Sequence, residues 1–144
     1  MILCDANLLL YAYDKSSPAH VRSRAWLEAT LSGEEPVGFA WVTLLAFLRI
    51  STNPRAVANP LTVAEASAIV SSWLEVPAVS VATPGPRHWE ILEEVLRVAQ
   101  AKGPLVTDAH LAALAIEHGA QLASADEDFA RFEGLRFVNP LADD

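Results

Sequence analysis

Short apolar segments typical of buried β-strands alternate along this chain with longer segments whose apolar residues recur at helical spacing. The strand-like segments fall at the N-terminus and at residues 37–41, 76–83, 120–126 and 135–138. Strands that alternate with helices of ten or more residues are typical of βαβ units, in which helices cover both faces of a parallel sheet. The alternation therefore predicts an α/β protein with three α/β/α layers and a central parallel sheet.

Capping residues indicate where several of the helices begin and end. Ser17 suits the N-cap and Pro18 the first position of a helix that stops at Gly33. Thr62 and Glu65 have the spacing of a capping box, which predicts a helix from there to about Trp73. Further helices are expected over 42–52, over 88–103 and from just after Asp108 to Gly119, with a short helical turn over 126–132.

Size and composition narrow the class of protein. With 144 residues and no internal repeat or linker, the chain is expected to form one domain over residues 1–144. No stretch approaches the roughly 20 apolar residues of a membrane span, and the N-terminus lacks the basic leader of a signal peptide. The single cysteine, Cys4, excludes an internal disulfide and a multi-cysteine zinc site. These features predict a cytoplasmic protein.

The charge balance bears on possible substrates. The chain carries 18 acidic and 10 basic residues and a formal net charge of −8. A surface of this sign repels nucleic acid rather than binding its phosphates. If the substrate is a nucleic acid, a divalent cation is needed to neutralise phosphate locally.

An aspartate, Asp5, interrupts the first apolar segment, ILCDANLLLYAY. A buried carboxylate without a partner costs several kcal/mol, so Asp5 must cap a helix, be paired or hold a cation. Asp108 stands before another expected helix, and Asp126 closes a strand with Asp128 two residues later. Because the carboxyl ends of parallel strands meet at one edge of a sheet, we expect these acids to converge there.

Converging carboxylates repel one another unless a positive charge lies between them. A set of oxygen ligands without His or Cys selects Mg²⁺ or Mn²⁺, ions that clamp phosphoryl oxygens and activate a bound water for phosphodiester hydrolysis. Aspartate is also a favoured N-cap residue, so each acid has a capping interpretation that is compatible with metal binding. We predict Asp5 and Asp108 as the principal metal ligands and Asp126 as the residue that completes the catalytic site.

Three stretches of the chain together resemble a known family, the PIN-domain ribonucleases, and in particular the VapC toxins of prokaryotic toxin–antitoxin pairs. The stretches are ILCDANLLLYAYD, FLRISTNP and LVTDAHLAALAIEHGAQLASADEDFARFEGLRFVNPL. With the helical segments between them, the likeness covers nearly the whole chain. The last stretch is the most specific, because an acid, a helix of small residues, a strand and an acid-x-acid-Phe sequence follow in order.

The resemblance implies a single PIN-like α/β/α domain whose acidic pocket binds Mg²⁺ or Mn²⁺. It implies a metal-dependent endoribonuclease that hydrolyses RNA phosphodiesters and is inhibited by a cognate, VapB-like antitoxin. Homodimers are common in the family, so a homodimer is expected. By position, Asp5, Asp108 and Asp126 match the family's first, third and fourth acidic positions, and Asp128 matches a more variable one.

One position departs from the family pattern. Many members carry a glutamate just before the Phe-apolar-Arg of the middle stretch, where this chain has Ala46, and no acid occurs between Glu35 and Glu65. Either one ion suffices, held by Asp5 and Asp108 with waters, or a neighbouring acid makes up the missing charge. The departure also favours an alternative function, a catalytically weakened PIN-like binding module that acts through antitoxin or RNA contacts.

A few other residues have more than one interpretation. Asp128 is the neighbouring acid that could supply the missing charge, and Arg49 could contact RNA phosphate, pair with a pocket carboxylate or be an ordinary surface arginine. Consecutive side chains of a strand face opposite ways, so Cys4 is expected to point away from the site as a buried structural residue. Core or dimer packing, rather than base stacking, is expected of the tryptophans Trp26, Trp41, Trp73 and Trp89.

Overall fold

The computed structural model describes residues 1–142, and within them a five-stranded parallel sheet forms the centre of the fold. Its order is β3-β2-β1-β4-β5, and every neighbouring pair is parallel, as the sequence predicted. Each strand is three residues long and therefore shorter than the predicted segment. The strands are β1 (Ile2–Cys4), β2 (Val37–Phe39), β3 (Val79–Val81), β4 (Gln121–Ala123) and β5 (Arg136–Val138).

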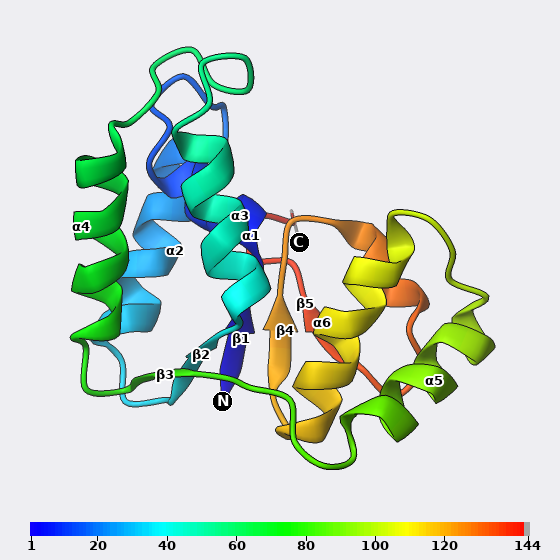
Figure 1. The fold of residues 1–144 in the computed structure, drawn as a ribbon. Coiled ribbons are helices and arrows are strands. Elements are labelled where there is room, and N and C mark those ends of the chain that lie inside the picture. Colours follow the sequence, from blue (N-terminus) through cyan, green and yellow to red (C-terminus); the bar gives the residue numbers. More distant parts are fainter. Residues whose placement is uncertain (143–144) are drawn as a thin grey trace.

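Helices cover both faces of this sheet, which confirms the predicted three layers (Figure 1). In Figure 1 the helices α2 and α4 lie to the left of the sheet and α5 and α6 to its right. The helices are α1 (Ala6–Ala12), α2 (His20–Ser32), α3 (Trp41–Ser51), α4 (Val63–Leu74), α5 (His88–Ala99) and α6 (Leu105–Glu117), followed by a short 3₁₀ helix, η1 (Glu127–Arg131). No helix within residues 1–142 is long and apolar enough to cross a membrane.

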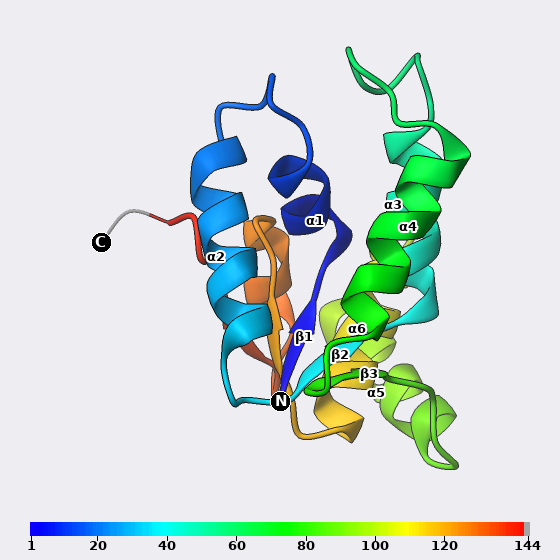
Figure 2. The same cartoon turned by 90° about the vertical axis from the view of Figure 1, so that its left-hand side faces the viewer.

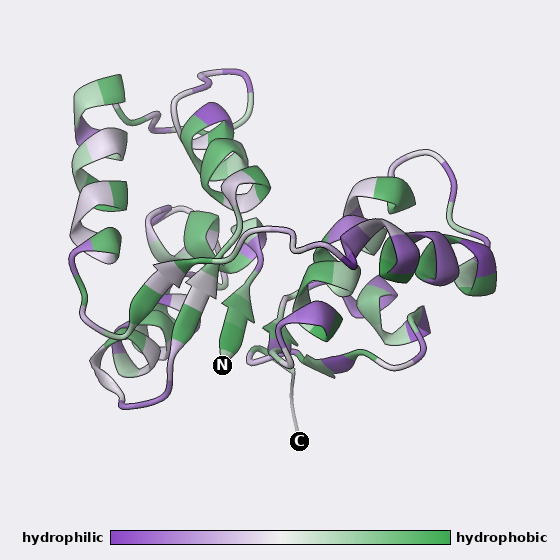
Figure 3. Ribbon diagram, turned by 60° about the horizontal axis from the view of Figure 1, so that its bottom comes forward, coloured by the Kyte–Doolittle hydropathy of each residue, from purple (hydrophilic) through white to green (hydrophobic). Residues whose placement is uncertain are grey.

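The pleat of the strands divides the apolar side chains between two cores. Cys4 and Phe39 pack with α1–α4, whereas Leu3 and Leu122 pack with α5, α6 and the chain around η1. Both cores contain side chains that are fully buried. Strands that are buried on both faces explain the apolar runs of the sequence, and Figure 3 shows polar residues concentrated on helices and loops.

The tryptophans differ from one another in burial. Trp73 is 1% exposed, and Trp26 is partly buried against the same core, so the packing prediction is confirmed for these two. Trp41 and Trp89, in the first turns of α3 and α5, are 54% and 63% exposed, so neither packs in the core and dimer packing stays a prediction for both. The indole ring of Trp73 makes aromatic contacts with the rings of Tyr13, Phe39 and Phe47.

A side-chain cap starts α4 as predicted, whereas two other helix ends differ from the prediction. The capping box of Thr62 and Glu65 is present, with N···O distances of 2.9 and 3.1 Å. The helix expected from Pro18 begins two residues later, at His20, because the Ser17 hydroxyl accepts from Ala19 N–H and completes a turn first. The helix expected to reach residue 103 ends at Ala99, where Gln100 adopts a left-handed conformation (φ 51°).

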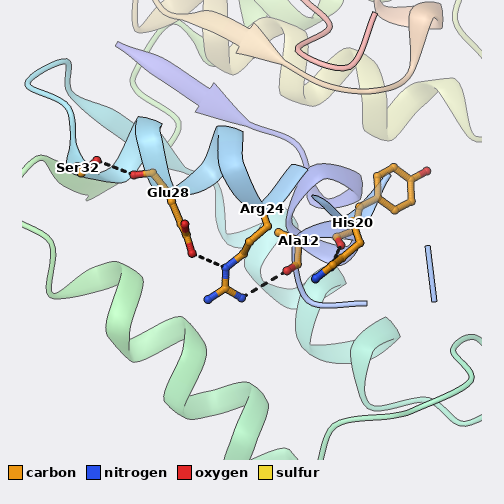
Figure 4. Close-up of polar contacts among 6 residues, drawn as sticks. Ala12, His20, Arg24, Glu28 and Ser32 are labelled. Atoms are coloured by element: carbon orange, nitrogen blue, oxygen red, sulfur yellow. Dashed lines mark hydrogen bonds and ion pairs between the residues drawn. The ribbon is translucent and has the colours of Figure 1, made fainter. Parts of the chain in front are cut away.

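Polar contacts also hold α2 against α1 (Figure 4). His20 Nδ1 lies 2.9 Å from the carbonyl oxygen of Tyr11, and Arg24 Nη1 donates to the carbonyl of Ala12 at 3.5 Å. Arg24 Nε also donates to Glu28 at 2.8 Å along the same helix. The last turn of α1 is thereby fixed, which steadies the helix that begins directly after Asp5.

The order of the strands creates a switch point beside β1. The chain passes from β1 to β2 and β3 on one side, then returns to place β4 and β5 on the other side. Figure 2 shows β1 rising from the N-terminus and continuing directly into α1. In open parallel sheets, ligands bind outside the carboxyl ends of the strands at such a point. The segments that follow β1 and β4 are therefore the first place to look for a site.

Candidate active site

Asp5 follows β1 directly and is the N-cap of α1. Its Oδ1 accepts from the Ala6 N–H at 2.7 Å, and its Oδ2 accepts from the Ser124 hydroxyl at 2.7 Å. The capping interpretation is therefore right, and the second carboxylate oxygen has a neutral hydroxyl as its partner. Each carboxylate oxygen has a second lone pair, so these contacts orient the group and still leave acceptor capacity for a ligand.

A small hydrogen-bond network joins the carboxyl ends of β1 and β4. Ser124 is fully buried, donates to Asp5, and accepts from Asn7 Nδ2 at 3.2 Å and from the Asp126 N–H at 3.0 Å. Asn7 Oδ1 in turn accepts from the Ala125 N–H at 3.2 Å. The single donor and both acceptor positions of the Ser124 hydroxyl are used, so this network fixes Asp5 and the start of the Asp126 loop relative to each other.

Asp126 caps η1, since its side chain accepts from the Asp128 N–H at 2.9 Å. Asp128 also lies 3.7 Å from the Arg131 guanidinium. The capping interpretation is therefore right for Asp126 as well. Arg131 brings a positive charge to this side of the site, which reasoning from the sequence did not anticipate.

Asp108 lies inside the first turn of α6, not before the helix. The helix begins at Leu105, because Gly103 (φ 60°) turns the chain and Pro104 serves as the N-cap. The preceding element is α5 rather than a strand, so a strand-to-helix junction is the wrong description for this acid. Asp108 nevertheless reaches the same edge of the sheet as Asp5.

A pocket of about 80 Å³ brings Asp5 and Asp108 together. It is formed where the first turns of α1, α3 and α6 meet, and Ala46 lines it at the position of the usual glutamate. Asp126 and Asp128 do not line it. The other lining residues are Ala6, Val42, Thr43, Thr107 and Leu111.

Burial and mutual repulsion disfavour negative charge in this pocket. Burial, with the nearby charges of Asp5, Asp126 and Asp128, raises the pKa of Asp108 to about 6, although Arg131 opposes the shift. Burial also raises the pKa of Asp5. The hydrogen bonds from Ser124 and Ala6 oppose this rise, and the charge of Asp126 adds to it. The four aspartates therefore act on one another electrostatically, and the pocket favours a proton or a cation.

Cys4 is excluded as a nucleophile. It is fully buried in the core on the α1–α4 side of the sheet. Burial, reinforced by the neighbouring Asp5, raises the pKa of its thiol to about 12. The thiol therefore stays protonated at neutral pH, as expected of a structural residue.

The pocket suits a hydrated divalent cation. Its polar lining residues carry only oxygen donors, namely two carboxylates and the hydroxyls of Thr43 and Thr107. The Thr43 hydroxyl is buried without a hydrogen-bond partner. No group of three or more His, Cys, Asp or Glu side chains that could hold a metal ion occurs among residues 1–142. Mg²⁺ commonly binds through one or two carboxylates and keeps several waters, so the pocket fits such an ion.

Arg49 and the histidines stand outside this pocket. Arg49 lies exposed in the last turn of α3, whereas the pocket is at the first turns of that helix. His88 Nε2 lies 2.9 Å from His110 Nδ1, between α5 and α6.

A larger hollow of about 510 Å³ lies at the far end of α6, where the Glu117 carboxylate accepts from the Gly85 N–H. It shares no lining residue with the acidic pocket.

The fold and the acidic edge of its sheet correspond to a known class of domain. A family model described as "PIN domain" matches residues 2–135. The chain therefore belongs to the PIN-domain family, as the sequence predicted. A solved complex of VapBC2 from Rickettsia felis, bound to a DNA fragment from its promoter, contains a chain with this fold. The match has a TM-score of 0.69 at 16% identity and covers 96% of this chain and 98% of that one.

Closer relatives define the branch of the family. Ribonuclease VapC37 of Mycobacterium tuberculosis is 46% identical over 142 residues, which are 99% of each chain. Ribonuclease VapC33 of the same species is 43% identical over 141 residues, 98% of this chain and 99% of that one. Within the PIN domains, this protein is a member of the VapC ribonucleases.

Proposed function

We propose that this protein is an Mg²⁺- or Mn²⁺-dependent endoribonuclease that acts as the toxin of a VapBC-type toxin–antitoxin pair. The observation that carries the proposal is that Asp5 and Asp108, far apart in the sequence, line one small pocket at the carboxyl edge of the sheet. The names of the relatives support ribonuclease activity. The side-chain donors in the pocket lining are all oxygens, which supports the choice of metal.

Each residue of the site has a distinct task in this proposal. Asp5 and Asp108 hold the cation, and Ser124 and the Ala6 N–H keep the Asp5 carboxylate oriented. The cation, when bound, neutralises phosphate charge and activates water for attack on the phosphodiester. Asp126 acts from outside the pocket, where its charge strengthens the preference for a cation and its position allows it to orient water. Such local neutralisation matters in a chain whose net charge of −8 otherwise disfavours contact with RNA.

The partners follow from the same proposal. The substrate is RNA, and the regulator is a VapB-like antitoxin that blocks the acidic pocket. The match to a chain in a VapBC complex supports an antitoxin partner. A homodimer is expected from the family and is testable by size-exclusion chromatography with light scattering.

RNA cleavage by the purified protein tests the activity. We expect cleavage that needs Mg²⁺ or Mn²⁺ and falls by roughly 10²- to 10⁴-fold in Asp5→Asn and in Asp108→Asn, because each change removes half of the pocket's negative charge. Glu94→Gln is the matched control, since Glu94 is an exposed acid on α5 paired with Arg97. Cleavage that persists undiminished in a pure Asp5→Asn, Asp108→Asn double variant would remove the mechanism.

A second candidate function is a PIN-like module that binds antitoxin or RNA with little catalysis. Ala46 favours it, because its methyl group lines the pocket where a third carboxylate would strengthen metal binding. Expression in a host cell separates the two functions. Toxicity that disappears with Asp5→Asn supports the enzyme, whereas toxicity that is indifferent to this change supports the binding module.

A further inference from the structure

The Thr43 hydroxyl is buried beside the acidic pocket and has no hydrogen-bond partner. Thr43 is 2% exposed, lies in the first turn of α3 and lines the pocket together with Asp5 and Asp108. Its Oγ1 is inaccessible to solvent and makes no hydrogen bond. Buried hydroxyl groups in folded proteins almost always have a partner, so this one calls for an explanation.

The start of α3 explains why the hydroxyl has no backbone partner. A threonine inside a helix usually donates to the carbonyl four residues earlier, as Thr52 at the end of α3 does to Leu48 at 2.7 Å. For Thr43 that residue is Phe39, which ends β2 and whose carbonyl accepts from the Ala82 N–H at 3.0 Å. No hydrogen bond joins the hydroxyl to this carbonyl, and the pocket that Thr43 lines is the adjacent space in which a partner can sit.

A valine would have the same shape without this cost. An unpaired buried hydroxyl destabilises the folded protein, and its replacement by an apolar group of equal size is neutral or stabilising. Ser51, at the other end of α3, also has a buried hydroxyl without a partner, but it does not line the acidic pocket. Within residues 1–142, Thr43 is the only side chain that combines an unpartnered buried polar atom with a place in this pocket.

Ala46 supplies the complementary observation. Thr43 and Ala46 are three residues apart in α3 and line the same pocket, so they share one face of the helix. The small side chain of Ala46 leaves room there for water. A hydroxyl on this face is able to accept a hydrogen bond from a water that a longer acidic side chain would displace.

We propose that Thr43 is a positioning residue for the cation held by Asp5 and Asp108, and that its hydroxyl accepts a hydrogen bond from the water shell of that cation. The inference rests on the proposed function and adds a third oxygen to the site. This neutral oxygen stands in for the carboxylate absent at Ala46. The site thereby gains a contact to the ion's shell without adding a further negative charge to a pocket whose acids already repel one another.

Titration with Mn²⁺ alone, in the absence of RNA, tests this role by calorimetry and by the Mn²⁺-induced shift of the unfolding midpoint. Thr43→Val is expected to bind Mn²⁺ about two- to tenfold more weakly, the effect of one lost hydrogen bond. Its metal-free midpoint is expected to equal or exceed that of the wild type. Thr43→Ser keeps the hydroxyl and is expected to bind within about twofold of the wild type. Ser51→Ala, the matched control, is expected to leave Mn²⁺ affinity unchanged.

The outcomes separate this inference from the proposed function. If Thr43→Val binds Mn²⁺ as the wild type does while Asp5→Asn does not, the Thr43 role is overturned and the metal site stands. If the wild type itself binds no Mn²⁺, the proposed metal site falls and the Thr43 role falls with it. A Thr43→Val protein that is less stable than the wild type without metal also overturns the inference, because the hydroxyl then has a structural partner.

Discussion

At the scale of single residues, Asp5 performs two tasks that are usually considered separately. It caps α1 and, through the same carboxylate, lines the pocket shared with Asp108. The hydrogen bonds from Ala6 and Ser124 offset part of the cost of burying the group, and the proposed cation offsets the rest. A helix cap at a sheet edge is therefore compatible with a ligand role.

The raised pKa of Asp108 makes a stability prediction for the metal-free protein. Because this pKa rises from 3.8 to about 6 on folding, the folded protein binds the proton more tightly than the unfolded chain does. Stability should therefore fall as the pH rises between these values. Asp108→Asn removes the titration, so without metal it is expected to unfold at a higher temperature than the wild type near neutral pH.

Calorimetric unfolding in the presence of a chelator, over a series of pH values, checks this expectation. The advantage of Asp108→Asn should shrink as the pH falls below about 6 and vanish near the ordinary aspartate value, where both proteins carry a neutral group. An advantage that is independent of pH would show that folding does not raise the pKa of Asp108.

The residues of the site differ in how far the sequence revealed them. Asp5 and Asp126 were found because each is an acid that follows an apolar strand. Ser124 was missed, although it stands two residues before Asp126, because the sequence does not reveal that its hydroxyl is buried and bonded to Asp5. Thr43 was missed because its significance depends on burial and on the lack of a partner, which a helical sequence pattern does not reveal.

At the scale of elements, helix ends were predictable where a side chain makes the cap. Thr62 carries its own signal and was found. The ends at Ala19 and Gln100 were not found, because a turn at Ser17 and a left-handed backbone at Gln100 set them and neither cap residue makes a side-chain capping bond. Strand lengths were overestimated because apolar residues flank the ladders, as Ala40 does after β2 and Val76 does before β3.

Packing of α4 against the sheet gives a prediction at this scale. Trp73 is 1% exposed and contacts aromatic rings from β2 and α3, whereas Trp89 is 63% exposed on α5. Trp73→Ala is expected to lower the free energy of unfolding by about 3–5 kcal/mol through the cavity it leaves. Trp89→Ala, its control, is expected to stay within about 0.5 kcal/mol of the wild type.

Urea unfolding of the two variants checks this contrast. Similar losses in both would mean that Trp89 is covered in the folded protein, as it would be in a homodimer that buries the outer face of α5. Protein concentration then becomes the second variable, since a dimer interface makes the midpoint depend on it.

At the scale of the whole molecule, the alternation of strands and helices predicted the layers and the parallel sheet. It did not predict the strand order, because no local signal tells which side of β1 the strand β4 will join. That order places the segment after β4 beside Asp5. Asp108 reaches the same pocket from the first turn of α6 and not from the end of a strand. The predicted convergence was right for Asp5 and Asp108, which line one pocket, whereas Asp126 and Asp128 lie outside that pocket and Asp108 reaches it from a helix.

The central claim is that Asp5 and Asp108 together hold one divalent cation. Mn²⁺ binding followed by electron paramagnetic resonance, with the wild type, each single Asp→Asn variant and Glu94→Gln, measures this directly. We predict one Mn²⁺ per chain, at least roughly tenfold weaker binding in Asp5→Asn and in Asp108→Asn, and no change in Glu94→Gln. Wild-type affinity in both single variants would contradict the claim.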